Sequence, residues 1–370
     1  MPKKAKVGVV GYGIIGKRVA DAVALQNDME LVGVADIISD YRLRVAVEKK
    51  YDIYCSVDDF RPMMEREGYE IKGNFPDFLS ECDIVVDCTP AGVPAKNKIF
   101  YEIKGEGGIP YIVQGGENHI LTGLSFSTLG NYAEAIGAKA ARVVSCNTTG
   151  LTRALSPLVR DFGIGDAFVA LCRRSADPSR TNRGPINGAV PVLGISHHGP
   201  DVETVVHALK GKIHSLAIAV SMTLSHVHMV RVKLEDQVTA EEVIDTWRRT
   251  PRVLVDSGRR GFYDTAQIVE YFRDLGRPRY DRPELFIWEE TVHVDGERNL
   301  SFISDVHMES IAIPENVDCI RAMLKMELDP FKCMEKTDAA MGIKRNSECY
   351  NIKERQRKTS KSPEKATAES

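Results

Sequence analysis

Cys146 lies in the stretch SCNTTGL (residues 145–151), where a short strand should turn into a helix. Residues 141–145 (ARVVS) predict a strand, whereas residues 148–162 carry leucines at helical spacing. A thiol at such a junction faces unpaired backbone N–H groups and the positive end of the helix dipole, and both favour the thiolate. Because free cysteine is also among the most buried residue types, two interpretations stay open: a nucleophile or a structural cysteine.

Two histidines downstream could act as proton acceptors. His226 and His228 lie in a predicted strand, so their side chains project to the same face. A neutral imidazole can take a proton from a thiol, or from a hemithioacetal formed on it, near neutral pH. We predict no metal at this His-x-His pair, because no Cys, Asp or Glu at metal-ligand spacing accompanies it.

Two further groups of side chains suit an anionic ligand. Four arginines follow one another at the end of a predicted strand and in the next loop: Arg173, Arg174, Arg180 and Arg183. Clustered guanidinium groups bind phosphate oxygens bidentately. His197-His198 precede Gly-Pro-Asp in a predicted loop. For both groups, the alternative is a solvated surface loop without a ligand.

A glycine-rich turn near the N-terminus indicates a dinucleotide. A short apolar strand, VGVV, leads directly into GYGIIG (residues 11–16) and then into a helical pattern. In such a unit Gly11 permits the tight turn, Gly13 lets the backbone approach a pyrophosphate, and Gly16 lets the helix pack on the sheet. The pyrophosphate would lie at the helix N-terminus.

An acidic residue follows at the distance that such a unit requires. The second predicted strand, LVGVA, ends in Asp36, twenty residues beyond Gly16. A carboxylate there accepts hydrogen bonds from the adenosine ribose hydroxyls, and it repels a 2′-phosphate. The strand, the glycine turn, the helix and Asp36 together predict a bound nicotinamide dinucleotide.

One reaction uses all of these groups. A cysteine adds to an aldehyde, the hemithioacetal delivers hydride to the nicotinamide, and water or phosphate cleaves the resulting thioester. N–H groups at a helix end and an imidazole would stabilise the transient oxyanion. The residues therefore predict an oxidoreductase that acts on an aldehyde.

Strands and helices alternate through the first half of the chain. Residues 83–88 and 111–114 are apolar strands, and each precedes a turn, at residues 89–90 and 115–116. This alternation predicts an α/β fold with a Rossmann-type, doubly wound parallel sheet. Ligands bind at the carboxyl ends of such strands, so both turns should line the cofactor cleft.

The second half is richer in strands. From about residue 166 strands dominate, and Asp295-Gly296 is a hairpin signal. This pattern predicts a second, α+β catalytic domain on a mixed or antiparallel sheet. We expect a dinucleotide-binding domain at 1–144, a catalytic substrate domain at 145–304, and a C-terminal helix at 305–335 that returns to the first domain. A disordered basic tail at 336–370 should follow.

Composition narrows the class of protein. The hydrophobic and charged contents of 43% and 27% are ordinary for a globular protein, and no run of eighteen apolar residues exists. The N-terminus lacks a signal-peptide pattern, and the eight cysteines form no CxxC, so we expect a cytoplasmic protein with reduced thiols. From residue 342 onward, eight Lys/Arg face four acids. We expect this tail to be solvated rather than to bind nucleic acid or a membrane.

Nearly the whole folded part, about residues 5 to 335, resembles the archaeal-type (class II) phosphorylating glyceraldehyde-3-phosphate dehydrogenases. The matching stretches are GYGIIGKRVADAV, DCTPAGVPAKN, QGGENH, LSFSTLGNYAEA, RVVSCNTTGLTR, RRSADP, RGPIN, SHHGPDV and PENVDCIRAM. The resemblance implies a homotetramer of glycolysis and gluconeogenesis. It further implies a phosphorylated aldehyde and inorganic phosphate as substrates, with NAD or NADP as cofactor.

The resemblance also implies roles for particular residues. Cys146 would be the nucleophile and His226 the general base, with His228 as the alternative. The substrate contacts would come from Ser145, Cys146, Asn147, His197 and His198. Ile14, Ile15, Gly115 and Arg174 would contact the cofactor. To these we add the residues of the dinucleotide unit, Gly11, Gly13, Gly16 and Asp36, and Met308, which stands at a position near the nicotinamide in the family.

Two of these positions depart from the family pattern. Ala35-Asp36 stands where the family commonly has Thr-Lys, and this exchange favours NAD over NADP. Met308 stands where a family glutamine lies near the nicotinamide, and a thioether cannot hold a carboxamide by strong hydrogen bonds. Two other functions remain as alternatives. One is aspartate-semialdehyde dehydrogenase or a related acyl-phosphate reductase, and the other is a non-catalytic, RNA-binding relative.

Overall fold

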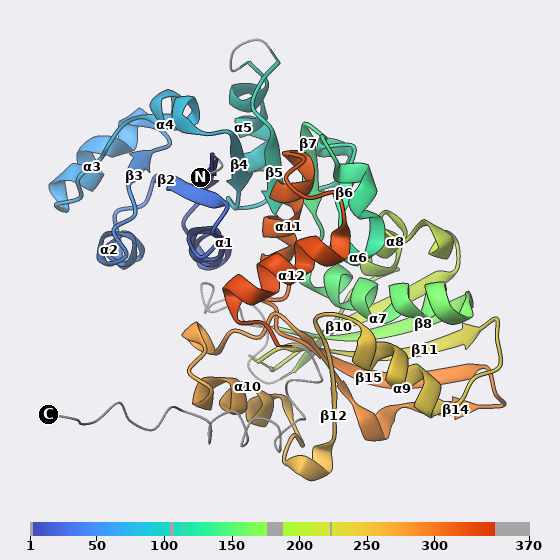
Figure 1. Cartoon of the computed structure of the whole chain (residues 1–370). Helices are drawn as coiled ribbons and strands as arrows, with labels where there is room; N and C mark the ends of the chain where they lie inside the picture. Colours follow the sequence, from blue (N-terminus) through green and yellow to red (C-terminus); the bar gives the residue numbers. More distant parts are fainter. Residues whose placement is uncertain (1–2, 104–106, 115, 176–187, 223, 345–370) are drawn as a thin grey trace, which may run out of the picture.

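Two β-sheets, each with its own helices, build the protein (Figure 1). The computed structural model describes residues 3–103, 107–114, 116–175, 188–222 and 224–344. The first sheet has seven strands in the order β3-β2-β1-β4-β5-β7-β6, and the second has eight. The predicted combination of a doubly wound sheet and a mixed sheet is confirmed.

All strand pairs of the first sheet are parallel. Its strands are β1 (Ala5–Val10), β2 (Met29–Asp36), β3 (Ile53–Cys55), β4 (Ile84–Asp87), β5 (Tyr111–Gln114), β6 (Ser125–Phe126) and β7 (Ala140–Val143). The helices between them are α1 (Ile14–Ala24), α2 (Tyr41–Glu48), α3 (Arg61–Arg66), α4 (Phe75–Glu81), α5 (Val93–Glu102) and α6 (Thr128–Asn131). The strand order reverses between β1 and β4, so the carboxyl ends of these two strands flank the crevice where such sheets bind ligands.

The second sheet mixes parallel and antiparallel pairs. Its strands are β8 (Ile164–Arg174), β9 (Ala189–Pro191), β10 (Ile213–Val220), β11 (His226–Leu234), β12 (Val253–Asp256), β13 (Leu285–Trp288), β14 (His293–Asp295) and β15 (Asn299–Val306). The pairs β8–β10 and β12–β13 are parallel, whereas β11 is antiparallel to β8 and β15. The predicted hairpin is present, because β14 pairs with β15 around Gly296. Its helices are α7 (Cys146–Phe162), α8 (His198–Glu203), α9 (Ala240–Arg249) and α10 (Thr265–Asp274).

One face of the second sheet is covered by helices and the other is exposed. Helix α7 packs on β11, β13 and β15, and α9 packs on α7, where the indole N–H of Trp247 donates to the Ala154 carbonyl at 2.9 Å. On the opposite face, Leu216, Ala170 and Met229 form a cross-strand row. Leu216 and Met229 are 53% and 42% exposed, so this row has no cover within the described chain.

The chain then returns to the first sheet through two helices. Helix α11 (Ile313–Met323) packs on α1, β5 and β7, and α12 (Pro330–Met341) packs on α11. The predicted start of a disordered tail at residue 336 is wrong, because α12 continues to Met341. Thr337 and Asp338 are buried within it, and Gly342 ends it in the left-handed conformation. Residues 345–370 lie outside the described part of the chain.

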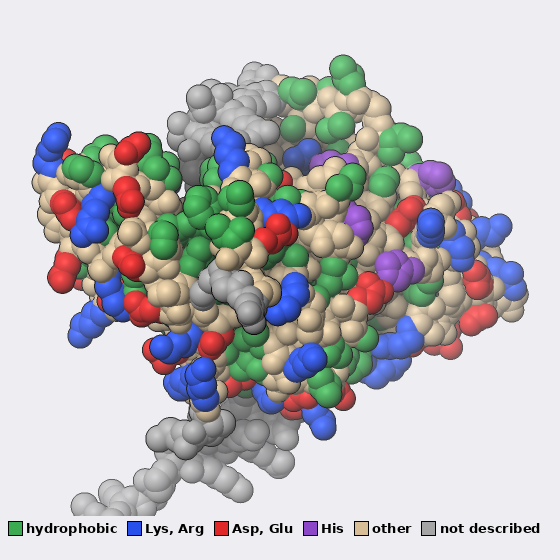
Figure 2. Space-filling view, turned by 90° about the horizontal axis from the view of Figure 1, so that it is seen from above, with side chains coloured by type: hydrophobic (Ala, Val, Ile, Leu, Met, Phe, Trp, Pro, Cys, Tyr) green, Lys and Arg blue, Asp and Glu red, His purple; other side chains and the backbone are tan. Residues whose placement is uncertain are grey.

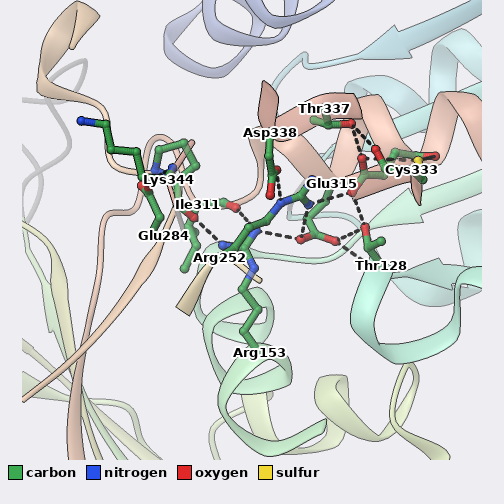
Figure 3. Close-up of polar contacts among 12 residues, drawn as sticks. Thr128, Arg153, Arg252, Glu284, Ile311, Glu315, Cys333, Thr337, Asp338 and Lys344 are labelled. Atoms are coloured by element: carbon green, nitrogen blue, oxygen red, sulfur yellow. Dashed lines mark hydrogen bonds and ion pairs between the residues drawn. The ribbon is translucent and has the colours of Figure 1, made fainter. Parts of the chain in front are cut away.

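Charged groups are buried where α7, α11 and α12 meet (Figure 3). Arg252 pairs with Asp318 and with Asp338, both at 2.7 Å, and Arg153 of α7 pairs with Glu315 at 2.7 Å. Burial alone would raise the pKa of Glu315, but attraction to Arg153 and Arg252 outweighs it and lowers the pKa to about 2. We name these five residues the buried ion cluster. It joins the helix that begins with Cys146 to the two C-terminal helices.

The surface carries mixed side chains. Seen from above, hydrophobic side chains gather in patches among charged ones (Figure 2). Within the described ranges, none of the helices has the length and apolar character needed to span a bilayer.

The buried ion cluster predicts a large effect of removing its central cation. Arg252→Met should lower the free energy of unfolding by about 3–5 kcal/mol, because buried carboxylates are left without a counter-charge. Urea titration followed by circular dichroism measures the loss. The control is Lys336→Met on α12, which breaks a more exposed pair with Glu327 and should cost at most about 1 kcal/mol. Equal losses in the two variants would contradict a central role for Arg252.

Candidate active site

Cys146 is the first residue of α7, directly after β7 and Val144-Ser145. Ser145 is the N-cap of the helix and accepts from the Thr148 N–H through its hydroxyl at 3.4 Å. The sequence-based start of the helix at Thr148 is therefore wrong by two residues, because the serine cap starts the helical turn at the cysteine. The expected placement of the thiol at a strand-to-helix junction is confirmed.

The expected ease of ionisation of Cys146 is wrong in the free protein. Burial raises the pKa of the Cys146 thiol to about 11. The Asn147 N–H and the charges of Arg174 and Arg173 act in the opposite direction without offsetting burial. The helix end that lowers the thiol pKa can be recognised in the sequence. The desolvation that raises this pKa depends on how the rest of the fold packs around the thiol.

Asn147 connects two histidines beside the cysteine. His228 donates from Nε2 to the Asn147 Oδ1 at 2.8 Å, and the Asn147 amide nitrogen donates to His198 Nε2 at 3.3 Å. All three side chains are buried, and burial lowers the pKa of His228 to about 3 and that of His198 to about 2. Both histidines are therefore neutral at physiological pH, and Asn147 fixes which nitrogen of each ring carries the proton.

His226 and His228 both face the interior, as the strand period predicts. His226 begins β11, and Ser225 before it has a φ of 69°, a left-handed conformation that turns the chain into the strand. The Arg174 N–H donates to His226 Nδ1 at 3.0 Å. Because burial lowers the pKa of His226, the ring is neutral, and its proton lies on Nε2.

Arg174 is held by the segment that contains Met308. Its Nη1 pairs with Glu309 at 2.8 Å, and its Nε donates to the Met308 sulfur at 3.1 Å. The structure thus brings together two residues that the resemblance assigns to the cofactor. Glu309 was missed by sequence reasoning, although it directly follows Met308.

The His197-His198 pair divides into an exposed and a buried ring. The ring centroids are 4.0 Å apart, His197 is exposed, and His198 is buried against Asn147. Asp201 of α8 pairs with Arg142 at 2.5 Å and accepts from the Thr148 hydroxyl at 2.8 Å. This aspartate, also missed by sequence reasoning, fixes α8 to the start of α7. Its place in the motif SHHGPD is the feature of the sequence from which Asp201 could have been recognised.

The glycine turn has the shape that a dinucleotide needs. Gly11 has a φ of 84°, and a Cβ added there would lie 2.8 Å from the Thr89 nitrogen. A Cβ on Gly16 would lie 1.8 Å from the Gly11 oxygen, so helix and turn are in direct contact. A Cβ on Gly13 would meet no atom within 4 Å, which leaves open space over the start of α1. The turn therefore fits a bound pyrophosphate.

Asp36 folds onto this turn. Its carboxylate accepts from the Tyr12 N–H at 2.5 Å and from the Ile37 N–H at 2.7 Å. Burial raises the pKa of Asp36, although these N–H groups and Arg42 oppose the shift. The carboxylate lies at the end of β2, at the edge where the adenosine ribose of a dinucleotide is expected.

Several predicted positions remain untested. Gly115, Arg180 and Arg183 lie outside the described residues. Among the residues that are described, no group of three or more His, Cys, Asp or Glu side chains could hold a metal ion.

A doubly wound sheet with this glycine turn, next to a mixed sheet that carries a thiol and histidines, defines a dinucleotide-dependent oxidoreductase. The family model described as "Glyceraldehyde 3-phosphate dehydrogenase, C-terminal domain" matches residues 145–276. The glyceraldehyde-3-phosphate dehydrogenase of Methanothermus fervidus is 44% identical over 339 residues, which are 91% of this chain and 98% of that protein. The protein of the same name from Methanobacterium bryantii is 47% identical over 341 residues (91% and 99%), and that of Thermococcus kodakarensis 44% over 341 (92% and 99%).

The chain belongs to the glyceraldehyde-3-phosphate dehydrogenase family, and the resemblance stated from its motifs is confirmed. Membership implies a nicotinamide cofactor, and the glycine turn would hold it.

The raised pKa of Cys146 has a measurable consequence. In the cofactor-free protein, alkylation of Cys146 by iodoacetamide should accelerate about tenfold per pH unit between about pH 7 and 10, because the reactive thiolate fraction rises by that factor below the pKa. Mass spectrometry of the Cys146 peptide gives the rate. The urea-unfolded chain is the control, and its rate should level off near pH 9. A folded-state rate that is already constant at pH 7 would contradict the assignment.

Proposed function

We propose that this protein oxidises D-glyceraldehyde 3-phosphate, with inorganic phosphate and NAD(P), to 1,3-bisphosphoglycerate through a thioester on Cys146. The observation that carries the proposal is the position of Cys146 at the first turn of α7, where the Asn147 N–H and the charges of Arg173 and Arg174 oppose the rise in pKa that burial causes. The role in glycolysis and gluconeogenesis, and a location in the cytoplasm, follow from the same proposal.

The sulfur of Cys146 forms and breaks the covalent bonds. The thiol releases its proton to solvent, and the thiolate adds to the aldehyde carbon to give a hemithioacetal oxyanion. Backbone N–H groups at the start of α7 stabilise this oxyanion. A nicotinamide dinucleotide held by the glycine turn would supply the hydride acceptor, and loss of hydride from that carbon leaves a thioester on Cys146. An oxygen of inorganic phosphate then attacks the thioester and its proton passes to solvent, the carbon–sulfur bond breaks, and the acyl phosphate leaves as the thiolate is restored.

His226 suits a donor role in this sequence. Its Nδ1 already accepts the Arg174 N–H, so the neutral ring offers an Nε2–H and no free lone pair. We therefore propose that Nε2–H donates to the hemithioacetal oxygen, in place of the general-base role that the resemblance implies. His228 is the weaker candidate, because its Nε2 is engaged with Asn147.

Asn147 and its neighbours position the substrate in this proposal. Ser145 and Asn147 flank the nucleophile, and Asn147 orients His198. His197 is exposed beside that ring and is free to contact the charged end of the substrate. Oxygen atoms of a phosphorylated aldehyde require such donors.

The cofactor preference is proposed from Asp36. The first turn of α1, with Gly13, Ile14 and Ile15, would hold the pyrophosphate. Asp36 lies against this turn, where a carboxylate binds ribose hydroxyls and repels a 2′-phosphate. We therefore propose NAD as the preferred cofactor, with Arg174 and Met308 on the nicotinamide side.

The exposed face of the second sheet supports self-association. The row of Leu216, Ala170 and Met229 is apolar, and such a face on a soluble chain marks a contact surface. We propose that copies of this chain cover it in a homotetramer.

Turnover of glyceraldehyde 3-phosphate tests the function. Wild-type protein should form NADH in a phosphate-dependent reaction, with a higher kcat/KM for NAD than for NADP. Cys146→Ser should lose at least about 10³-fold in kcat, because a hydroxyl is a far weaker nucleophile than a thiolate. Cys172→Ser in β8 is the control and should retain activity. Preferential turnover of aspartate semialdehyde, or a preference for NADP, would overturn the corresponding part of the proposal.

Sedimentation tests the assembly. The wild-type protein should sediment with the mass of four chains, and Met229→Asp should produce smaller species, because it places a charge in the apolar row. Leu328→Asp, which changes another exposed apolar residue, should leave the mass unaltered. A monomeric wild-type protein would refute the assembly without affecting the assigned chemistry.

A further inference from the structure

A cavity of about 420 Å³ lies between α1 and the connection from α10 to β13. The C-terminal end of α12 closes it, with Met341, Gly342 and Lys344. None of the residues assigned above to the substrate or the cofactor lines this cavity. Its volume is in the range of small-molecule binding sites.

The lining is cationic. It contains five cationic side chains, Arg18, Lys49, Arg277, Arg279 and Lys344, and two carboxylates, Asp21 and Asp281. A third carboxylate, Glu284, lies beside the cavity and pairs with Arg277 at 2.5 Å. Even with all three carboxylates ionised, two positive charges remain in excess.

The excess comes from two groups of side chains. In the first, Lys49 and Arg279 share Asp21, both at 2.9 Å. In the second, Arg277 pairs with Glu284, and the side chain of Lys344 forms no ion pair within the described part of the chain. The Arg18–Asp281 pair at 2.8 Å is balanced.

Apolar side chains also line the cavity. Ala22 comes from α1, Leu25 is the C-cap of that helix, Pro278 lies in the connection, Ile313 in α11 and Met341 in α12. Leu25 is 55% exposed. An apolar surface of this kind favours a ligand with a carbon skeleton over a bare inorganic ion.

The connection from α10 to β13, which forms one wall of the cavity, contains two residues with an unfavourable backbone conformation. Arg279 and Tyr280 have φ values of 56° and 49°, which side-chain-bearing residues adopt at a cost. Ion pairs to α1, Arg279–Asp21 and Arg18–Asp281, hold this conformation. The wall is therefore formed before any ligand arrives.

The cavity adjoins both parts of the active site. Ser310 lines it, and the Ser310 hydroxyl contacts His307 Nδ1 at 2.7 Å, one residue before Met308. Arg18 donates to the Ile14 carbonyl at 3.0 Å, at the start of α1. A ligand here would contact the helix that follows the glycine turn and the segment that holds Arg174.

From the cavity, its excess of two positive charges and its apolar walls, we infer a second binding site, for a small organic phosphate. A phosphate monoester carries nearly two negative charges at neutral pH, which match the excess. Its carbon skeleton would pack on the apolar walls. Cys146 does not line the cavity, so binding here would not require the free thiol.

Calorimetric titration of the full-length protein with phenyl phosphate tests this inference. Wild-type protein should bind it, and binding should weaken as salt is added, because the attraction is ionic. Lys344→Glu should weaken binding at least about tenfold, since it replaces an attractive charge with a repulsive one. Lys332→Glu, on the exposed side of α12, should bind as the wild type does. Phenol, with the same ring and no phosphate, should bind at least about tenfold more weakly.

Two further measurements separate this site from the active site. Binding should persist after alkylation of Cys146, and it should not require the nicotinamide cofactor. Lys344→Arg, which keeps the charge, should retain the affinity, and Lys49→Glu, in the other charged group, should weaken it if Lys344→Glu does not fold. Equal affinity in wild type, Lys344→Glu and Lys49→Glu, or loss of binding on alkylation, would overturn the inference. Because the titration does not depend on turnover, it is informative whether or not the proposed reaction is correct.

Discussion

The rest of the structure depends on a set of charges that water does not reach. Arg252 stands before β12 and is held by carboxylates of α11 and α12, while Arg153 of α7 is held by Glu315. Such groups are costly to bury, so each must find its partner for the chain to close. The second sheet and the C-terminal helices can satisfy these charges only when they meet in one relative position. That position sets where the first turn of α7, and so Cys146, lies against the dinucleotide crevice.

What the sequence could predict was local. The glycine turn, the strand before it and the helix after it are contiguous in the chain, and the two-residue period of β11 places His226 and His228 on one face. The thiol pKa could not be predicted in the same way, because its desolvation comes from residues far away in sequence. The same holds for Glu309 and Asp201, whose partners are Arg174 and Arg142. The last turns of α12 could not be predicted, because the residues buried beyond position 335, Thr337 and Asp338, are polar and give no apolar period.

The structure shows the contacts of the two residues that depart from the family pattern, Asp36 and Met308. Asp36 is bound to the glycine turn by backbone N–H groups, which hold its carboxylate in place without a cofactor. Met308 contacts Arg174 through its sulfur, so a thioether here supports a guanidinium group rather than an amide. Both substitutions act on how a dinucleotide would be held and leave the thiol and its histidines unchanged.

The proton of His226 is positioned by a main-chain group. The donor is the amide of residue 174, which every amino acid except proline supplies. Substitution of the side chain at position 174 can therefore alter contacts with the dinucleotide without moving the imidazole proton of His226. The tautomer of His226 depends on the backbone path of β8 and β11 and not on a side chain. Paralogues that change cofactor or substrate but keep these strands would therefore keep the same protonation state at this ring.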